Sequence, residues 1–157
     1  MRNAILATIA VALLPAFAAS ASAQPGPPVT ITTNLLLPSF PAGPPNTGTY
    51  YGTFSASNGD SGSVTAYALL SAVPSPIVGV FHTNQILTGA NGTLELRCTE
   101  IAKSFENPAA VSGSGGCAVL SATGVYAGLG GSGKVSSTAN FTVQPMTFTD
   151  TVVLGAQ

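Results

Sequence analysis

The sequence has few charged side chains, one histidine and no tryptophan, and these shortages exclude several kinds of function. Charged residues make up 6% of the chain, whereas a typical soluble domain has about 25%. A nucleic-acid-binding protein needs a basic surface, which the four Lys and Arg residues here cannot build. The same shortage excludes attraction to anionic membranes. We therefore expect no nucleic-acid partner and a surface wetted mainly by neutral polar groups.

The first 23 residues have the three parts of a cleavable secretory signal peptide. Arg2 supplies a positive charge, residues 5–19 form an uncharged apolar core, and Ala21-Ser22-Ala23 gives the small residues that a signal peptidase accepts. The core is shorter than the roughly 20 residues that span a bilayer, and Pro15 interrupts it. We therefore predict cleavage before Gln24, a secreted or periplasmic mature protein, and no membrane anchor after cleavage.

The mature chain is predicted to be one all-β domain. We divide the sequence into a signal peptide at 1–23, a Pro-rich leader at 24–28 and a β domain at 29–157. The β-branched residues of Val29 to Leu37 favour a first strand, and the apolar segment Met146 to Leu154 is the last. About eight strands with short connections predict a closed antiparallel barrel, with a two-sheet β-sandwich as the alternative. Closure would pair the first strand with the last and remove two apolar edges.

The strand at residues 93–99 has the clearest pattern. The dipeptide Asn91-Gly92 before it tolerates positive φ at both central positions of a hairpin turn. Alternate residues, which have the same parity and face the same side of a strand, are apolar here: Leu94, Leu96 and Cys98. Alternation with polar residues is typical of a strand with one buried face. Glu100 shares the buried parity, so it points inward if the strand stays regular, or is solvated at the rim if the strand ends near Thr99.

Other segments have the composition of turns and loops. Gly and Pro residues favour a strand stop at 73–76, a loop at 104–116 and a Gly-rich turn region at 124–133. The glycines of the last region allow the sharp bends that barrel corners require. We expect the strands to be confined to the segments between these stops.

The two cysteines, Cys98 and Cys117, both lie in the mature chain. Export would take them to an oxidising compartment, where two cysteines allow one intramolecular pairing. Closing a loop of about 20 residues in this way contributes on the order of 3 kcal/mol. We predict this disulfide, with a buried pair of free thiols or an intermolecular bond as the alternatives. No metal site is expected here, since a single histidine is available to join the cysteines.

The segment from Ser121 to Gly133, SATGVYAGLGGSG, resembles the Gly-rich signature of barrels related to allene oxide cyclase and the plant dirigent proteins. Small exported proteins of that superfamily carry a similar stretch. The resemblance covers residues 87–136, although Ala122 stands where the family commonly has glycine. It implies an eight-stranded antiparallel barrel, in agreement with the strand count. Family enzymes place acidic and other polar residues inside the barrel, but no motif here transfers those positions residue by residue.

Two residues are candidates for catalysis. An inward Glu100 would have a raised pKa and would act as acid or base. His82 is the single histidine, and a role as base or ligand needs an oriented partner. Its alternative is a hydrogen-bonded strand histidine without a chemical role. The sequence holds no phosphate-binding loop, serine-hydrolase motif or metal-ligand cluster, so we expect no cofactor and no metal.

Three hypotheses about function follow. The first is an exported, non-enzymatic barrel that binds a small apolar ligand, because small barrels enclose room for one. The second is a cyclase- or isomerase-like enzyme that uses Glu100, with His82 as a further candidate. The third is a structural surface protein that self-associates through its low-charge faces. A co-purifying ligand would favour the first hypothesis, and an inward acidic residue beside a pocket would favour the second.

Overall fold

The computed structural model describes residues 27–38, 46–75, 77–103 and 106–156 of the 157-residue chain. The predicted signal peptide and residues 24–26 of the leader lie outside them. The described part is all β, apart from a 3-10 turn at Gly124–Tyr126 (η1). Its strands are β1 (Val29–Leu37), β2 (Asn46–Ala56), β3 (Ser61–Ser75), β4 (Val78–Gly89), β5 (Thr93–Lys103), β6 (Val111–Ala122), β7 (Leu129–Asn140) and β8 (Met146–Ala156). No helical segment among these residues is long and apolar enough to cross a membrane.

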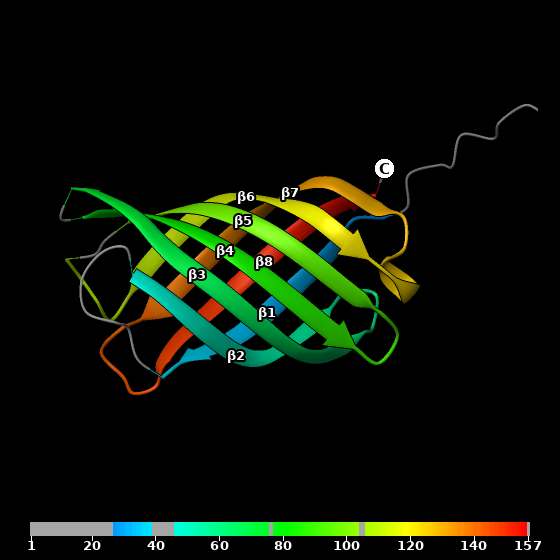
Figure 1. The fold of residues 1–157 in the computed structure, drawn as a ribbon, viewed down its shortest axis with the longest axis horizontal. Coiled ribbons are helices and arrows are strands. Elements are labelled where there is room, and N and C mark those ends of the chain that lie inside the picture. Colours follow the sequence, from blue (N-terminus) through cyan, green and yellow to red (C-terminus); the bar gives the residue numbers. More distant parts are fainter. Residues whose placement is uncertain (1–26, 39–45, 76, 104–105, 157) are drawn as a thin grey trace, which may run out of the picture.

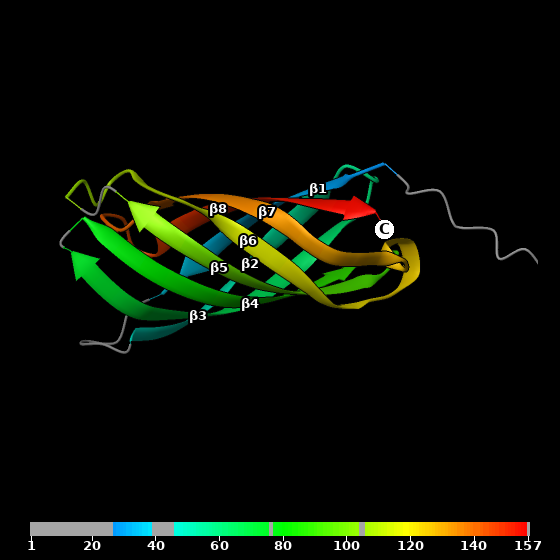
Figure 2. The same ribbon diagram turned by 90° about the horizontal axis from the view of Figure 1, so that it is seen from above.

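The eight strands form a closed antiparallel barrel in sequence order, as predicted (Figure 1). Each strand pairs with its neighbours in the chain, and the ring closes where β1 pairs with β8 from Val29↔Leu154 to Leu37↔Met146. Figure 2 shows the strands running obliquely around the barrel, as closure of a sheet requires. Because every strand has two partners, the apolar first and last strands leave no free edge.

Strands extend into all three predicted stops, and the prediction of a loop at 104–116 is wrong over its second half. β6 begins at Val111 and runs through the whole Gly-Ser segment. A Cβ at Gly115 would collide with the carbonyl oxygen of Thr99, so glycine is what lets β5 and β6 approach each other here. β3 passes the stop at Pro74 by means of register shifts after Leu70. β7 begins at Leu129, inside the predicted turn region.

Inward side chains fill the barrel along most of its length. The alternation predicted for residues 93–99 is confirmed, and Leu94, Leu96 and Cys98 are buried. Cys98 faces Cys117 across the β5–β6 pair, and the two form the predicted disulfide with a Cα–Cα distance of 4.0 Å. The disulfide belongs to the larger of two buried apolar clusters. The smaller cluster is formed by Leu70, Phe81, Ala102 and Val111.

The two ends of the barrel differ. At the end that holds the β2–β3, β4–β5 and β6–β7 connections, Tyr126 of η1 is fully buried and fills the interior. Asp60 is buried beside it and accepts hydrogen bonds from the backbone N–H and the Nδ2 group of Asn91, both at 3.2 Å. We call this the closed end. The opposite end, where odd-numbered strands finish and even-numbered strands begin, is called the cavity end.

Candidate functional site

Glu100 lies inside the barrel near the cavity end. β5 continues in regular pairing to Lys103, so Glu100 keeps the inward parity of Cys98 and is 5% exposed. The alternative of a solvated residue at the rim is therefore wrong. The strand does not end at Thr99 because β4 and β6 supply pairing partners on both sides of it as far as Lys103. Ser137, from β7, forms a side-chain hydrogen bond with the Glu100 carboxyl.

A second carboxyl, Asp150 of β8, shares this part of the interior and is also 5% exposed. The fully buried Gln85 of β4 donates a hydrogen bond from Nε2 to Oδ2 of Asp150 at 2.6 Å. Since β4 and β8 stand four strands apart in a ring of eight, this bond crosses the barrel. The two residues thus form a polar layer across an interior whose buried side chains are mostly apolar.

A cavity opens between this polar layer and the cavity end. Its walls are mainly apolar, and its polar side chains come from Tyr50, Thr83, Glu100, Ser137 and Asp150. The apolar part of the lining consists of Leu35, Ala68, Phe81, Ala102, Val111, Gly113, Ala139, Phe141 and Phe148. The free volume is about 40 Å³, which holds about two or three water molecules.

The cavity is acidic. Its described lining holds two carboxyls and no Lys, Arg or His side chain. Burial raises the pKa of Asp150 to about 7, and the neighbouring Glu100 adds to the rise, while hydrogen bonds from Gln85 and Thr33 oppose it. Burial also raises the pKa of Glu100, against the hydrogen bond from Ser137. The two carboxyls therefore titrate as a pair that retains protons to higher pH than separate, solvated carboxyls would.

Two buried polar atoms beside the carboxyl pair have no hydrogen-bond partner within the described residues. They are Oγ1 of Thr83, which lines the cavity, and Oε1 of Gln85 in the polar layer. A buried oxygen without a partner costs free energy unless water or a ligand satisfies it. Because the cavity is large enough for water, Oγ1 of Thr83 marks a place where a polar ligand group would gain a hydrogen bond.

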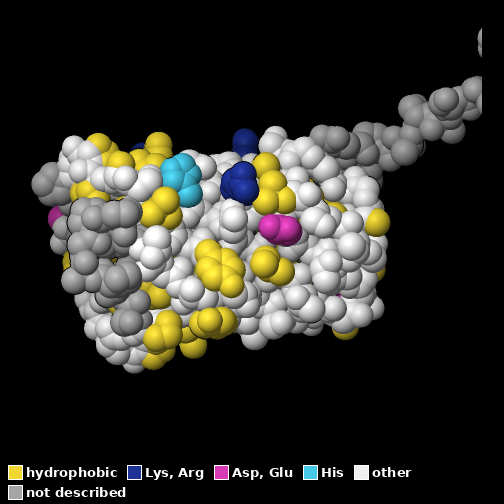
Figure 3. Space-filling view, viewed as in Figure 1, with side chains coloured by type: hydrophobic (Ala, Val, Ile, Leu, Met, Phe, Trp, Pro, Cys, Tyr) yellow, Lys and Arg dark blue, Asp and Glu magenta, His cyan; other side chains and the backbone are white. Residues whose placement is uncertain are grey.

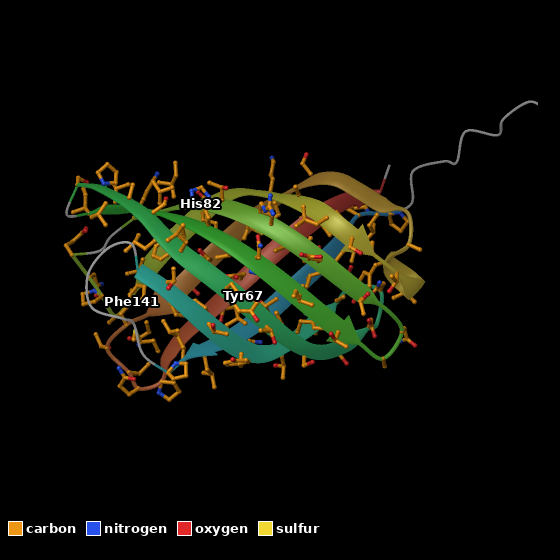
Figure 4. All side chains as sticks on the ribbon, in the orientation of Figure 1. Tyr67, His82 and Phe141 are labelled. Atoms are coloured by element: carbon orange, nitrogen blue, oxygen red, sulfur yellow. A yellow bond between two sulfur atoms is a disulfide. The ribbon has the colours of Figure 1, made fainter. Side chains whose placement is uncertain are left out.

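Aromatic rings form much of the cavity wall. Phe148 makes edge-to-face contacts with Tyr50, at a centroid distance of 4.6 Å, and with Phe141, at 5.3 Å. Burial raises the pKa of Tyr50, and the charges of Asp150 and Glu100 add to the rise, so its phenol stays protonated. Figure 4 labels Phe141 at the cavity end of the barrel, on the connection between β7 and β8. The rings provide a rigid apolar surface next to the carboxyl pair.

His82 lies outside the barrel and takes no part in this site. Its ring faces solvent (Figures 3 and 4), and Nδ1 lies 3.0 Å from Oγ1 of Thr99 on the adjacent strand. It borders a shallow outer groove of about 520 Å³ together with Tyr67, which is 54% exposed, and Arg97. The structure thus brings Glu100 to the cavity and leaves His82 on the other side of the sheet. Charged side chains are also sparse on the face shown in Figure 3.

The sequence prediction missed Asp150 and Gln85. A signal for Asp150 was present, because it shares parity with apolar Met146, Phe148, Val152 and Leu154 along the last strand. Gln85 similarly shares parity with Phe81 and Leu87. When two separate strands each carry a polar residue among their inward-facing apolar residues, the two residues are expected to share a polar site. The sequence does not show which strands lie opposite each other, because this depends on how the barrel closes.

Within the described part of the chain, no three His, Cys, Asp or Glu side chains lie close enough to hold a metal ion. The sequence matches no protein-family model, and no curated protein matches it significantly. The likeness to allene oxide cyclase and dirigent barrels therefore rests on the Gly-rich segment quoted above. Function has to be argued from the cavity itself.

Proposed function

We propose that this chain is an exported β-barrel that binds one small molecule at the cavity end, with a polar group of the ligand against Glu100 and Asp150. One observation carries the proposal: two buried carboxyls line a cavity that has no basic side chain in its described lining. Desolvating carboxyls without a cationic partner costs stability. Groups perturbed in this way, set in a cleft, are concentrated at functional sites.

The size of the cavity limits how a ligand would bind. Pockets for whole drug-sized molecules measure about 300–1,000 Å³, while this cavity offers about 40 Å³. The polar layer would thus receive only the head of the ligand. The apolar remainder would lie against Phe81, Val111 and Phe141, which line the same cavity nearer the end of the barrel.

Export is part of the same proposal. The three-part pattern of residues 1–23 supports secretion or transfer to the periplasm. The disulfide between Cys98 and Cys117 supports it independently, because disulfides persist in oxidising compartments.

The test is a binding measurement on the mature, oxidised chain. Titration calorimetry with eight-carbon amphiphiles (octan-1-ol, octan-1-amine and octanoate) should detect binding of at least one of them. Ala139→Phe fills the cavity and should abolish that binding, whereas Ala118→Phe on the exposed face of β6 should leave it intact. Circular dichroism confirms that both variants fold. Failure of all three probes to bind, or equal binding by the two variants, would contradict the proposal.

The position of Glu100 favours a second candidate, an isomerase or cyclase. A carboxyl of raised pKa beside a cavity can remove a proton from a carbon next to a carbonyl and return it to another carbon, with no other reactant needed. The probe is the conversion of cyclohex-3-enone to the conjugated cyclohex-2-enone, followed by ultraviolet absorbance. Activity that Glu100→Gln abolishes supports the enzyme, and a rate equal to that of buffer rejects proton transfer on this probe.

A further inference from the structure

The ionisable side chains in the described lining of the cavity are all acids. Glu100 comes from β5, Asp150 from β8 and Tyr50 from β2. The described inward residues of β1, β3, β4, β6 and β7 at this end include no ionisable side chain. Arg97, Lys103 and Lys134 are exposed on the outside of their strands. Where the carboxyl pair is ionised, a bound anion would therefore meet negative charge without compensation, which disfavours carboxylate and phosphate heads.

The remaining groups at the site suit a cation with several N–H donors. Oγ1 of Thr83, in the cavity lining, is a buried oxygen without a partner and is able to accept a hydrogen bond; Oε1 of Gln85, next to Asp150 but outside the lining, is another. Aromatic rings also line the cavity, and the face of such a ring attracts a positive charge. An ammonium group has three donors and no acceptor, so it matches a site built from acceptors and rings. An alcohol has one donor and cannot balance the charge of the carboxyl pair.

We propose that the ligand of the cavity end is a primary aliphatic amine, bound as an ammonium ion between Glu100 and Asp150 with its apolar chain directed toward Phe141. This inference rests on the proposed binding function and specifies its ligand class. The ammonium head fits a cavity of about 40 Å³, because it is little larger than a water molecule. The chain of the amine would contact the aromatic wall near the end of the barrel.

Binding of the ammonium ion is linked to the protonation of the carboxyl pair. Aliphatic amines are cationic throughout neutral pH, as the Lys side chain is. When the ammonium ion binds, the carboxyl pair of Glu100 and Asp150 releases a proton to the buffer, so the ammonium ion takes the place of that proton. Affinity for the amine should therefore increase as pH rises from 5 to 8. A neutral ligand would show no such increase, since it gains nothing from the ionised pair.

The experiment is calorimetry of the mature chain with octan-1-amine, octan-1-ol and octanoate at pH 6 and pH 8. We expect octan-1-amine to bind about tenfold or more tightly than octan-1-ol at pH 8, from charge-assisted hydrogen bonds and the ring faces. Repeating the titration in buffers of different ionisation enthalpy should show proton release on amine binding. Octanoate should not bind detectably.

Variants locate the effect in the carboxyl pair. Asp150→Asn and Glu100→Gln should each weaken octan-1-amine about tenfold and leave octan-1-ol within about twofold. Glu106→Gln, at an exposed position, is the control and should change neither. If a carboxyl variant does not fold, the inference is tested by the affinity of the unmodified chain for octan-1-amine, which should be higher at pH 8 than at pH 6. Binding of octan-1-ol or octanoate as tight as that of the amine overturns the inference but not the proposed function, whereas failure of every probe overturns both.

Discussion

Gln85 and Asp150 face each other across the barrel, and Nε2 of Gln85 donates to Oδ2 of Asp150 at 2.6 Å. The two residues come from β4 and β8, on opposite sides of the ring. Asp150 lines the cavity, whereas the fully buried Gln85 is not part of its lining. A polar brace therefore links opposite walls of the barrel beside the cavity.

Replacing Gln85 with Met should destabilise the protein, more at pH 8 than at pH 5. The amide donor favours the ionised form of Asp150, so its loss leaves a buried carboxylate without that partner. A buried group left unpaired costs about 1–3 kcal/mol. Urea unfolding at both pH values measures the effect. Equal losses at pH 5 and pH 8 would show that Gln85 contributes packing alone.

Stability of the unmodified protein should fall as pH rises. Asp150 has a pKa of about 7 in the folded state, above the ordinary value of 3.8, so the folded state binds protons more tightly than the unfolded state. The protonated Asp150 therefore adds to the free energy of unfolding. This contribution is full below about pH 4 and decreases as pH rises to 7, by up to about 1.4 kcal/mol per pH unit for each proton. Asp150→Asn should flatten the curve of unfolding free energy against pH, while Glu106→Gln should follow the unmodified protein. A curve that rises from pH 5 to pH 8 would count against a buried, proton-retaining pair.

Two adjacent glycines of β6 should respond differently to substitution by alanine. A Cβ at Gly115 would collide with the backbone of β5, while the nearest atom to a Cβ at Gly116 is the carbonyl oxygen of Gly133 at 3.6 Å. Gly115→Ala should cost about 1–3 kcal/mol because the strands must move apart. Gly116→Ala should be nearly neutral or slightly stabilising, since it restricts the unfolded chain. Thermal unfolding of the two variants tests this, and equal melting temperatures would contradict the register of β5 and β6.

Removing the disulfide should destabilise the barrel without changing its fold. Cys98 and Cys117 are separated by 19 positions, and closing a loop of this length contributes on the order of 3 kcal/mol. The double variant Cys98→Ala/Cys117→Ala should unfold at lower denaturant concentration and be insensitive to reductant. In the unmodified chain, thiol titration under denaturing, non-reducing conditions should find no free thiol. Two titrated thiols would mean that the protein matures without this bond.

The fold followed from local patterns in the sequence, because each pattern is decided by neighbours close along the chain. The alternation in residues 93–99 and the turn signal at Asn91-Gly92 both predict one hairpin, and the structure contains it. The turn itself differs from the prediction, because it spans residues 90–92 and Gly92 does not have positive φ. The Gly-Ser segment from Ser112 to Gly116 misled the prediction, since it forms a strand in which Gly115 allows close packing against β5. That packing depends on β5, which local composition does not reveal.

The site was only half predictable for a related reason. Parity placed Glu100 on the buried face, but whether β5 extended that far depended on its pairing with β6. Asp150 and Gln85 lie 65 positions apart, and they meet only because the barrel closes. The sequence of each strand contains only one residue of this polar site, and the residues come together only when the strands close into a barrel.

The most direct test of the proposed site is carbon-detected NMR titration of the Glu100 and Asp150 side-chain carboxyls, with and without octan-1-amine. The free protein should show coupled titration, with Asp150 responding near pH 7, as its burial beside Glu100 requires. Saturation with the amine should shift this titration to lower pH and perturb both carboxyl signals. Titration of both groups near pH 4 in the free protein, unchanged by the amine, would contradict the buried carboxyl pair and its role in binding.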